Sequence, residues 1–303
     1  MNGIAPSKPV RGGWRYYRNL LVFTVITVLV AIVFVIPIYD AITSMHPRRY
    51  PIGSVSPADL GLDYEEVTLT TEDGLRLRGW YVPAKNGAAV ILVHAFNGNR
   101  TGTLYHAALL AEHGYGVILY DTRTQGESEG DLYAMGWDAY RDVFAALDYL
   151  ETRPEVDPRR IGVLGLSAGA KIALFATAKT DRIAAVVAEG GGYFTFNDWF
   201  FATDPSQRIW APSMWVTYTT VSIATRVREP IPLRLAVAQI SDRPVYLISA
   251  ENDRFSNQAY FEAAGEPKTF WLRKEPGHIE ALFAQHDEYE QRVIGFFDQA
   301  LQK

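Results

Sequence analysis

Short apolar runs alternate with mixed segments of helical length along most of the chain. The apolar runs, each the length of a buried strand, cover residues 64–70, 75–82, 88–93, 115–120, 161–166, 184–188, 244–249 and 268–272. The first two flank Glu72-Asp73-Gly74, which predicts a hairpin. Because the later runs alternate with helical segments, we expect an α/β fold with a mostly parallel sheet and helices on both faces.

A longer apolar run precedes this pattern. Residues 20–39 carry no charge and, as a helix, would be about 30 Å long, enough to cross the hydrocarbon core of a membrane. The preceding segment is basic, with Lys8, Arg11, Arg15 and Arg18 and no acid. The positive-inside rule therefore predicts an uncleaved signal-anchor with a cytoplasmic N-terminus and an extracytoplasmic main domain. A cleaved signal peptide and a buried core helix remain alternatives.

These patterns divide the chain into four parts. We expect a cytoplasmic basic segment over residues 1–19, a transmembrane helix over 20–39, a proline-rich linker over 40–63, and one α/β domain over 64–303.

Composition narrows the function classes. The hydrophobic fraction of 48% supports a large core and argues against a disordered chain. The absence of cysteine excludes disulfide scaffolds, cysteine nucleophiles and thiolate metal sites. Beyond residue 18 the chain has 25 basic and 34 acidic residues, which disfavours nucleic acid as a partner. The histidines lack metal-ligand spacing, so we predict no metal, and no feature indicates a cofactor.

One apolar run leads into Gly165-Leu166-Ser167-Ala168-Gly169, followed by a small-residue helix predicted over 170–178. A serine hydroxyl becomes a useful nucleophile when it projects from a tight strand-to-helix turn towards a base. The alternative is a glycine-rich turn with a capping serine. The residues that would accompany a nucleophile must therefore decide between the two.

A catalytic serine needs a histidine and an orienting carboxylate, in the order Ser, acid, His for this turn. His278 follows a strand, as a base should, whereas His286 lies in a polar stretch beside the final helix. Asp253 lies just after the run 244–249 and 25 positions before His278. Glu251 and Glu189 are the competing acids, each of which is otherwise a solvated loop carboxylate.

The reaction also needs hydrogen-bond donors for an oxyanion. The residue after the serine, Ala168, supplies one backbone N–H, and the loop after residues 88–93 should supply the other. In that loop we expect the donor to be Phe96. His94 precedes the serine in the chain and closes a strand, so we interpret it as structural.

Together these residues resemble the α/β-hydrolases of the serine aminopeptidase and monoacylglycerol-lipase-like type. The matching segments are residues 94–99, 120–130, 165–169, 244–253 and 277–278. The resemblance covers residues 64–302 and implies that Ser167 is the nucleophile, Asp253 the acid and His278 the base. It also implies an oxyanion hole made by Phe96 and Ala168. The chain has Ala95 where family members usually have glycine.

The segment between the runs 184–188 and 244–249 is too long for one crossover helix. Members of the superfamily commonly place a helical lid here, which we expect over about 192–240. Its aromatic side chains predict an apolar substrate pocket, although packing of the lid onto the domain is an equal alternative. The candidate substrate contacts are Phe194, Phe196, Trp199, Trp210 and Trp215.

The sequence therefore predicts a membrane-anchored serine hydrolase that cleaves carboxylic esters through an acyl-enzyme. Its expected partners are the membrane and a small-molecule ester or lipid-like substrate with an apolar acyl or aryl group. A peptidase or amidase remains an alternative, as does a catalytically silent hydrolase fold that serves as a binding module. The triad chemistry alone does not separate esters from amides.

Overall fold

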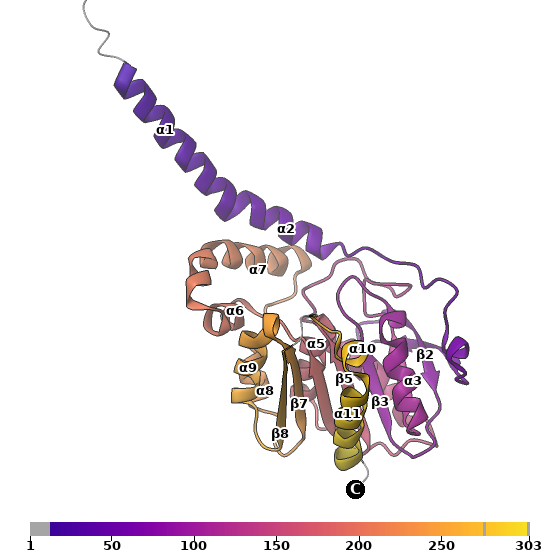
Figure 1. The fold of residues 1–303 in the computed structure, drawn as a ribbon. Helices are drawn as coiled ribbons and strands as arrows, with labels where there is room; N and C mark the ends of the chain where they lie inside the picture. Colours follow the sequence, from indigo (N-terminus) through magenta and orange to yellow (C-terminus); the bar gives the residue numbers. More distant parts are fainter. Residues whose placement is uncertain (1–12, 275–276, 302–303) are drawn as a thin grey trace, which may run out of the picture.

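The predicted apolar runs form a central sheet in the computed structural model, which describes residues 13–274 and 277–301 (Figure 1). Within these residues the sheet has eight strands in the order β1-β2-β4-β3-β5-β6-β7-β8. The strands are β1 (Glu65–Thr70), β2 (Arg76–Val82), β3 (Ala89–Val93), β4 (Gly116–Tyr120), β5 (Ile161–Leu166), β6 (Ala185–Glu189), β7 (Val245–Ala250) and β8 (Lys268–Arg273). The α/β fold is confirmed.

The sheet is parallel except at one edge. Strand β2 pairs antiparallel with both β1 and β4, whereas the remaining strands pair in parallel. Every residue of β3, β4, β5, β6 and β7 is buried. Since ligands of open parallel sheets bind outside the carboxyl ends of the strands, the ends of β3, β5, β6 and β7 are where a site is expected.

Helices cover both faces of the sheet (Figure 1). One core cluster includes side chains of α4 (Tyr140–Glu151), α5 (Ala168–Lys179), α8 (Leu233–Val237) and α9 (Arg254–Ala263). The other cluster includes side chains of α3 (Leu104–Glu112), α10 (Ala281–Ala284) and α11 (His286–Leu301). Short 3-10 turns lie at η2 (Pro57–Leu60), η3 (Arg100–Thr103) and η5 (Glu251–Asp253). The two-sided arrangement agrees with the prediction from the alternating pattern.

The apolar N-terminal run is helical from Gly13 to Met45 and is long and apolar enough to cross a membrane. It comprises α1 (Gly13–Val30), a π-helical turn η1 (Ala31–Val35) and α2 (Ile36–Met45), and α1 projects away from the body (Figure 1). No described residue of α1 is buried. Most of the predicted cytoplasmic segment, residues 1–12, lies outside the described residues, and the orientation across a membrane stays a prediction.

The end of this helix packs on the lid instead of starting a linker. Helix α2 buries Pro37, Ala41 and Met45, which share one face at intervals of four residues, in its packing with α7 (Ala211–Thr225). The Ser213 hydroxyl donates to the carbonyl of Ile32 at 3.1 Å. Residues 40–45, expected in the linker, are therefore helical because their apolar face has a partner.

The segment that follows is also attached to the domain. The amide of Tyr133 donates to the carbonyl of Met45 at 2.9 Å, and the Arg49 guanidinium donates to the carbonyl of Gly130 at 2.7 Å. The side-chain amide of Asn99 donates to the carbonyl of Tyr50 at 3.2 Å. These bonds fix the path of residues 45–50 over the loops at the carboxyl end of the sheet.

The expected lid lies between β6 and β7. It consists of α6 (Phe196–Ala202), η4 (Pro205–Trp210), α7 and α8. Helix α7 contains no charged residue and contacts both α2 and η1. The lid and the N-terminal helix are therefore packed together on the same side of the molecule as the expected site.

Candidate active site

Ser167 lies between β5 and α5 in a backbone conformation that non-glycine residues rarely adopt, with φ 54° and ψ −110°. The flanking glycines permit this turn because neighbouring backbone atoms approach them too closely for a side chain. A Cβ on Gly165 would lie 2.2 Å from the carbonyl oxygen of Gly169, and one on Gly169 would lie 2.1 Å from that of Val93. Only glycine fits at these two positions, which explains the Gly-x-Ser-x-Gly pattern.

Three side chains from three loops meet at Ser167. His278, on the loop after β8, has its Nε2 2.7 Å from the hydroxyl oxygen of Ser167. Its Nδ1 lies 2.5 Å from Oδ2 of Asp253, which ends η5 after β7. With the proton on Nδ1, the imidazole donates to Asp253 and accepts from the Ser167 hydroxyl. The predicted serine, base and acid are thus brought together in hydrogen-bonded order.

The charges around His278 favour its protonated form. The hydrogen bond to Asp253 raises the pKa of His278, and the charges of Asp253 and Glu189 act in the same direction. Burial and the nearby Lys171 oppose this rise. The imidazole is therefore suited to take up a proton from Ser167 and hold it.

The loop that carries Asp253 is held by the first turn of α9. The side-chain amide of Asn257 donates to the carbonyl of Asp253 at 2.9 Å, and its Oδ1 accepts from the amide of Gly191 at 3.1 Å. Ser256 donates to the carbonyls of both Asp253 and Gly191. Asn257 and Ser256 thus join the acid loop to the loop after β6, an arrangement that no sequence pattern indicated.

The competing candidates lie elsewhere. Glu251 pairs with Arg254, and His286 is exposed beside Asp287 and Glu290. Glu189 is buried at the end of β6, where its Oε1 accepts from the amide of Ala281 at 2.9 Å. Burial raises the pKa of Glu189 to about 7. Its carboxylate therefore braces the segment after His278 without bonding to the imidazole.

His94 has the structural role expected for it. It is buried, its Nδ1 lies 2.7 Å from the carbonyl oxygen of Ala95, and its Nε2 accepts from the amide of Thr122 at 3.0 Å. These bonds connect the loop after β3 to the loop after β4. The residue of this loop with positive φ is Asn97, at 56°, and not Ala95. The alanine found in place of the usual glycine is therefore accommodated, since asparagine tolerates this conformation.

The two expected oxyanion donors flank the serine. Ala168 is the first residue of α5, where backbone N–H groups have no acceptor within the helix. Phe96 lies in the loop after β3 and stacks on Tyr133 at 5.0 Å between ring centroids. Both residues line the cavity that contains Ser167.

This cavity has a volume of about 280 Å³. It is lined by Ser44, Phe96, Tyr133, Met135, Ser167, Ala168, Lys171, Gly192 and His278. Ser44 comes from α2, so the N-terminal helix contributes to the wall of the site. An adjoining cavity of about 510 Å³ shares Ser44 and Phe96 with it and continues to His46 and Arg48.

None of the five lid aromatics lines the cavity at Ser167, so the predicted substrate contacts are not placed there. Trp210 and Trp215 are more than half exposed on the outer side of the lid. Phe194 is buried against Phe175, and Phe196 stacks with Trp199. Phe194, Phe196 and Trp199 therefore contribute to packing and not to the wall of the cavity.

The residues that line the cavity in place of the lid aromatics were not predicted from the sequence. Tyr133 and Met135 lie in an irregular segment between β4 and α4, and Met135 has a positive φ of 56°. Lys171 lies four residues after Ser167 on α5, hence on the same side of the helix. This spacing from the serine was the one available signal for a charged cavity residue.

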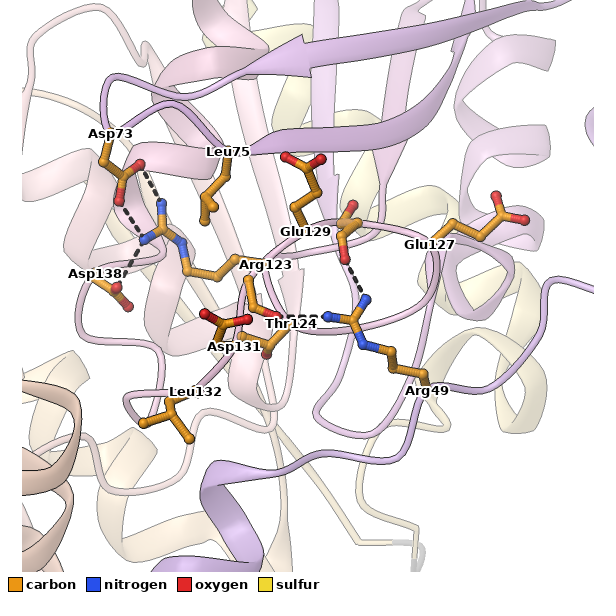
Figure 2. A pocket seen from close by; sticks show the side chains of 12 residues that line it. Arg49, Asp73, Leu75, Arg123, Thr124, Glu127, Glu129, Asp131, Leu132 and Asp138 are labelled. Carbon is orange, nitrogen blue, oxygen red and sulfur yellow. Dashed lines mark hydrogen bonds and ion pairs between the residues drawn. The ribbon is translucent and has the colours of Figure 1, made fainter.

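A further cavity, of about 620 Å³, lies at the loops after β4, and none of the predicted site residues lines it (Figure 2). The Arg123 guanidinium crosses this region and bonds to the carboxylates of Asp73, Asp138 and Asp142. Figure 2 shows Asp73 and Asp138 converging on it from separate loops. These paired charges fasten the loops around the site to one another.

The chain is similar in sequence to several known proteins. Residues 68–290 match the family model of X-Pro dipeptidyl-peptidase (S15 family). The Escherichia coli K12 protein YfhR, which is uncharacterized, is 28% identical over 248 residues, or 78% of this chain and 81% of YfhR. Polyketide transferase ATR5 of Stachybotrys chlorohalonatus is 31% identical over 234 residues, or 76% of this chain and 69% of ATR5.

Solved structures with the same fold include hydrolases. The Pyrococcus furiosus esterase Pf2001 aligns with a TM-score of 0.68 at 25% identity, covering 84% of this chain and 99% of the esterase. Dienelactone hydrolase from Anabaena variabilis aligns with a TM-score of 0.57 at 18% identity, covering 79% and 99%, and so shares the fold. These matches confirm the α/β-hydrolase fold and the expected resemblance to serine hydrolases of this superfamily.

Proposed function

We propose that this chain is a serine hydrolase that cleaves carboxylic esters. The chain belongs to the X-Pro dipeptidyl-peptidase (S15) family and is therefore a hydrolase of the α/β type. The observation that carries the proposal is the hydrogen-bonded series of Ser167, His278 and Asp253, with 2.7 Å and 2.5 Å between the bonded atoms. The strained backbone of Ser167 supports it, since such strain is concentrated at functional sites.

In the proposed reaction the Ser167 hydroxyl attacks the ester carbonyl while His278 Nε2 takes its proton. Asp253 holds the imidazole and stabilises its positive charge. The backbone N–H groups of Phe96 and Ala168 stabilise the oxyanion. His278 then donates the proton to the leaving alcohol, which leaves an acyl-enzyme, and a water molecule activated by the same imidazole releases the acid.

A fluorophosphonate probe tests the nucleophile directly. We expect the folded wild-type protein to be labelled at Ser167, and the variants Ser167→Ala and His278→Ala to lose the label. A wild-type protein that is folded but unlabelled would show that the site is silent, as in a hydrolase fold that only binds. Circular dichroism on the same samples separates loss of reactivity from loss of folding.

A peptidase is the second candidate, because the matching family model describes an X-Pro dipeptidyl-peptidase. An enzyme that removes dipeptides from an N-terminus must bind a free ammonium group, which calls for a carboxylate near the serine. The described residues that line the cavity at Ser167 include Lys171, whose positive charge repels an ammonium group, and no carboxylate. This charge favours esters.

The two candidates predict opposite substrate preferences. We expect p-nitrophenyl butyrate to be hydrolysed with a higher kcat/KM than glycyl-prolyl p-nitroanilide. The wild-type protein should be compared with Ser167→Ala to subtract background hydrolysis. A clear preference for the anilide would replace the esterase by the peptidase.

We also propose that the helix from Gly13 to Met45 anchors the enzyme in a membrane. Its length, the mean hydropathy of 3.1 over an 18-residue stretch of it and the exposure of the apolar side chains of α1 support the proposal, because such a surface is unstable in water. The basic residues before it favour a cytoplasmic N-terminus and an extracytoplasmic catalytic domain. Added protease should then digest the domain on intact cells, whereas full protection would reverse the orientation.

A further inference from the structure

Lys171 is a positively charged residue in the lining of the cavity at Ser167. It lies one helical turn beyond the serine on α5 and lines the same space as Ser167, Ala168 and His278. Four residues of α-helix advance by about 6 Å, a distance that the lysine side chain can span. The ammonium group is therefore within reach of a substrate whose carbonyl is bound at Ser167.

No carboxylate among the described residues forms an ion pair with Lys171. Its Nζ donates to the carbonyl of Tyr193 at 3.1 Å and lies 6.0 Å from the centroid of the Phe194 ring. The acid whose charge acts on it, Asp198, is already bonded to Thr195, Leu233 and Arg234. An ammonium group has three donors, so two of them remain for a ligand.

Holding this charge without an ion pair is costly. Burial lowers the pKa of Lys171 to about 8, and the group still carries its proton at neutral pH. A buried charge destabilises a protein unless an opposite charge offsets it. An anionic group that entered the cavity would supply that charge and would gain a charge-assisted hydrogen bond.

The rest of the cavity suits a short apolar chain. Phe96, Tyr133 and Met135 provide an apolar wall, and the volume of about 280 Å³ limits the size of the bound group. The cavity thus combines a nucleophile, an apolar wall and a single cation.

We propose that Lys171 is a specificity-determining residue that binds a carboxylate of the substrate, so that the preferred substrates are esters with a short apolar chain and a free carboxylate. This inference rests on the proposed function and specifies its substrate class. The lysine acts by holding the substrate, with the ester bond presented to Ser167.

Paired esters test the charge preference. Monoethyl glutarate carries the carboxylate on the acyl side and 4-acetoxybutyrate carries it on the alcohol side, and each has a neutral carboxamide counterpart of the same shape. We expect the wild-type protein in its membrane or detergent form to prefer at least one carboxylate over its carboxamide by roughly tenfold in kcat/KM. Equal values for both pairs would overturn the proposal.

Substitutions assign the preference to Lys171. In Lys171→Met the ratio of carboxylate to carboxamide kcat/KM should fall to about one. In Lys171→Glu this ratio should fall below one, and an ester with a quaternary ammonium group should become the preferred substrate. Lys179→Met is the matched control, because it removes a lysine at the other end of α5, where the side chain lies over Tyr140 and Phe175. A preference that survives in Lys171→Met would refute the assignment.

Binding provides a readout that does not depend on turnover. Glutarate should raise the Tm of the wild-type protein more than glutaramate does, and this difference should vanish in Lys171→Met but persist in Lys179→Met. If fluorophosphonate labels Ser167 but glutarate gives no selective shift, the carboxylate site is wrong while the serine hydrolase stands. If glutarate shifts the Tm selectively but Ser167 is not labelled, the carboxylate site stands while the serine hydrolase is wrong.

Discussion

Ser167 holds a conformation that glycine adopts far more readily, with φ 54° and ψ −110°. The strain is retained because the turn aims the hydroxyl at His278, 2.7 Å away. Such strain agrees with the role proposed for Ser167, because strained residues are concentrated at functional sites.

Replacing this serine should therefore separate activity from stability. We expect Ser167→Gly to lose esterase activity and to gain about 1 kcal/mol in the free energy of unfolding, because glycine relieves the strained φ. Ser167→Ala should be equally inactive without that gain. Urea unfolding of the two variants side by side measures the difference, and a less stable glycine variant would contradict the strain.

Asp253 should control how the activity depends on pH. Because the bond to Asp253 raises the pKa of His278, the protonated and inactive imidazole persists to a higher pH, and kcat/KM should rise with pH through that elevated value. Asp253→Asn should lower kcat by roughly 10⁴-fold and move the acid limb of the profile to lower pH. A stopped-flow or pH-stat profile of both proteins checks the direction, and an unmoved limb would exclude Asp253 as the partner.

At the scale of elements, the sequence predicted the strands and the turn that carries the serine. The runs that form β3 to β7 were the clearest, because strands buried on both faces of a parallel sheet read as continuous apolar segments. The positions of Ser167, Asp253 and His278 followed from the ends of these strands.

The lid and the cavity wall were not predictable in the same way. An aromatic ring fits an apolar core and an apolar pocket equally well, so nothing in the sequence indicated that Phe194 and Trp199 are buried away from the cavity. Tyr133 and Met135 come from an irregular segment that has no periodic pattern. Ser44 could not be assigned to the cavity because its helix was expected to end at residue 39.

The contact between β3 and α5 depends on Gly169. A methyl group there would meet the backbone of Val93 at 2.1 Å, and a strand in the middle of the sheet cannot move away. We expect Gly169→Ala to cost about 3 kcal/mol of stability. Gly295→Ala in α11 is the control, since nothing lies within 4 Å of its added Cβ, and it should stabilise by up to about 1 kcal/mol. Thermal unfolding of both variants tests this, and equal effects would contradict the close packing.

For the whole molecule, we propose two functions for the N-terminal helix, anchoring and support of the lid, that a truncation series can separate. Removing residues 1–35 deletes the most exposed apolar part but leaves α2 on the lid. We expect this protein to leave the membrane fraction while retaining hydrolysis of soluble esters. Removing residues 1–45 also deletes Ala41 and Met45, which are buried, and Ser44 of the cavity wall.

The longer truncation should therefore lower the free energy of unfolding by about 2–4 kcal/mol and reduce kcat/KM. Cell fractionation, urea unfolding and ester assays on the two truncated proteins measure the three effects. If both truncated proteins behave alike, α2 belongs to the anchor and not to the catalytic body.

In the proposed anchor, the continuous helix from Gly13 to Met45 would act as a lever. One arm would stand in the lipid, and the other carries Ser44 into the wall of the cavity. A bilayer of different thickness tilts a transmembrane helix. Any such tilt would shift Ser44 relative to Ser167, so turnover would depend on the thickness of the surrounding membrane with no regulator bound to the enzyme.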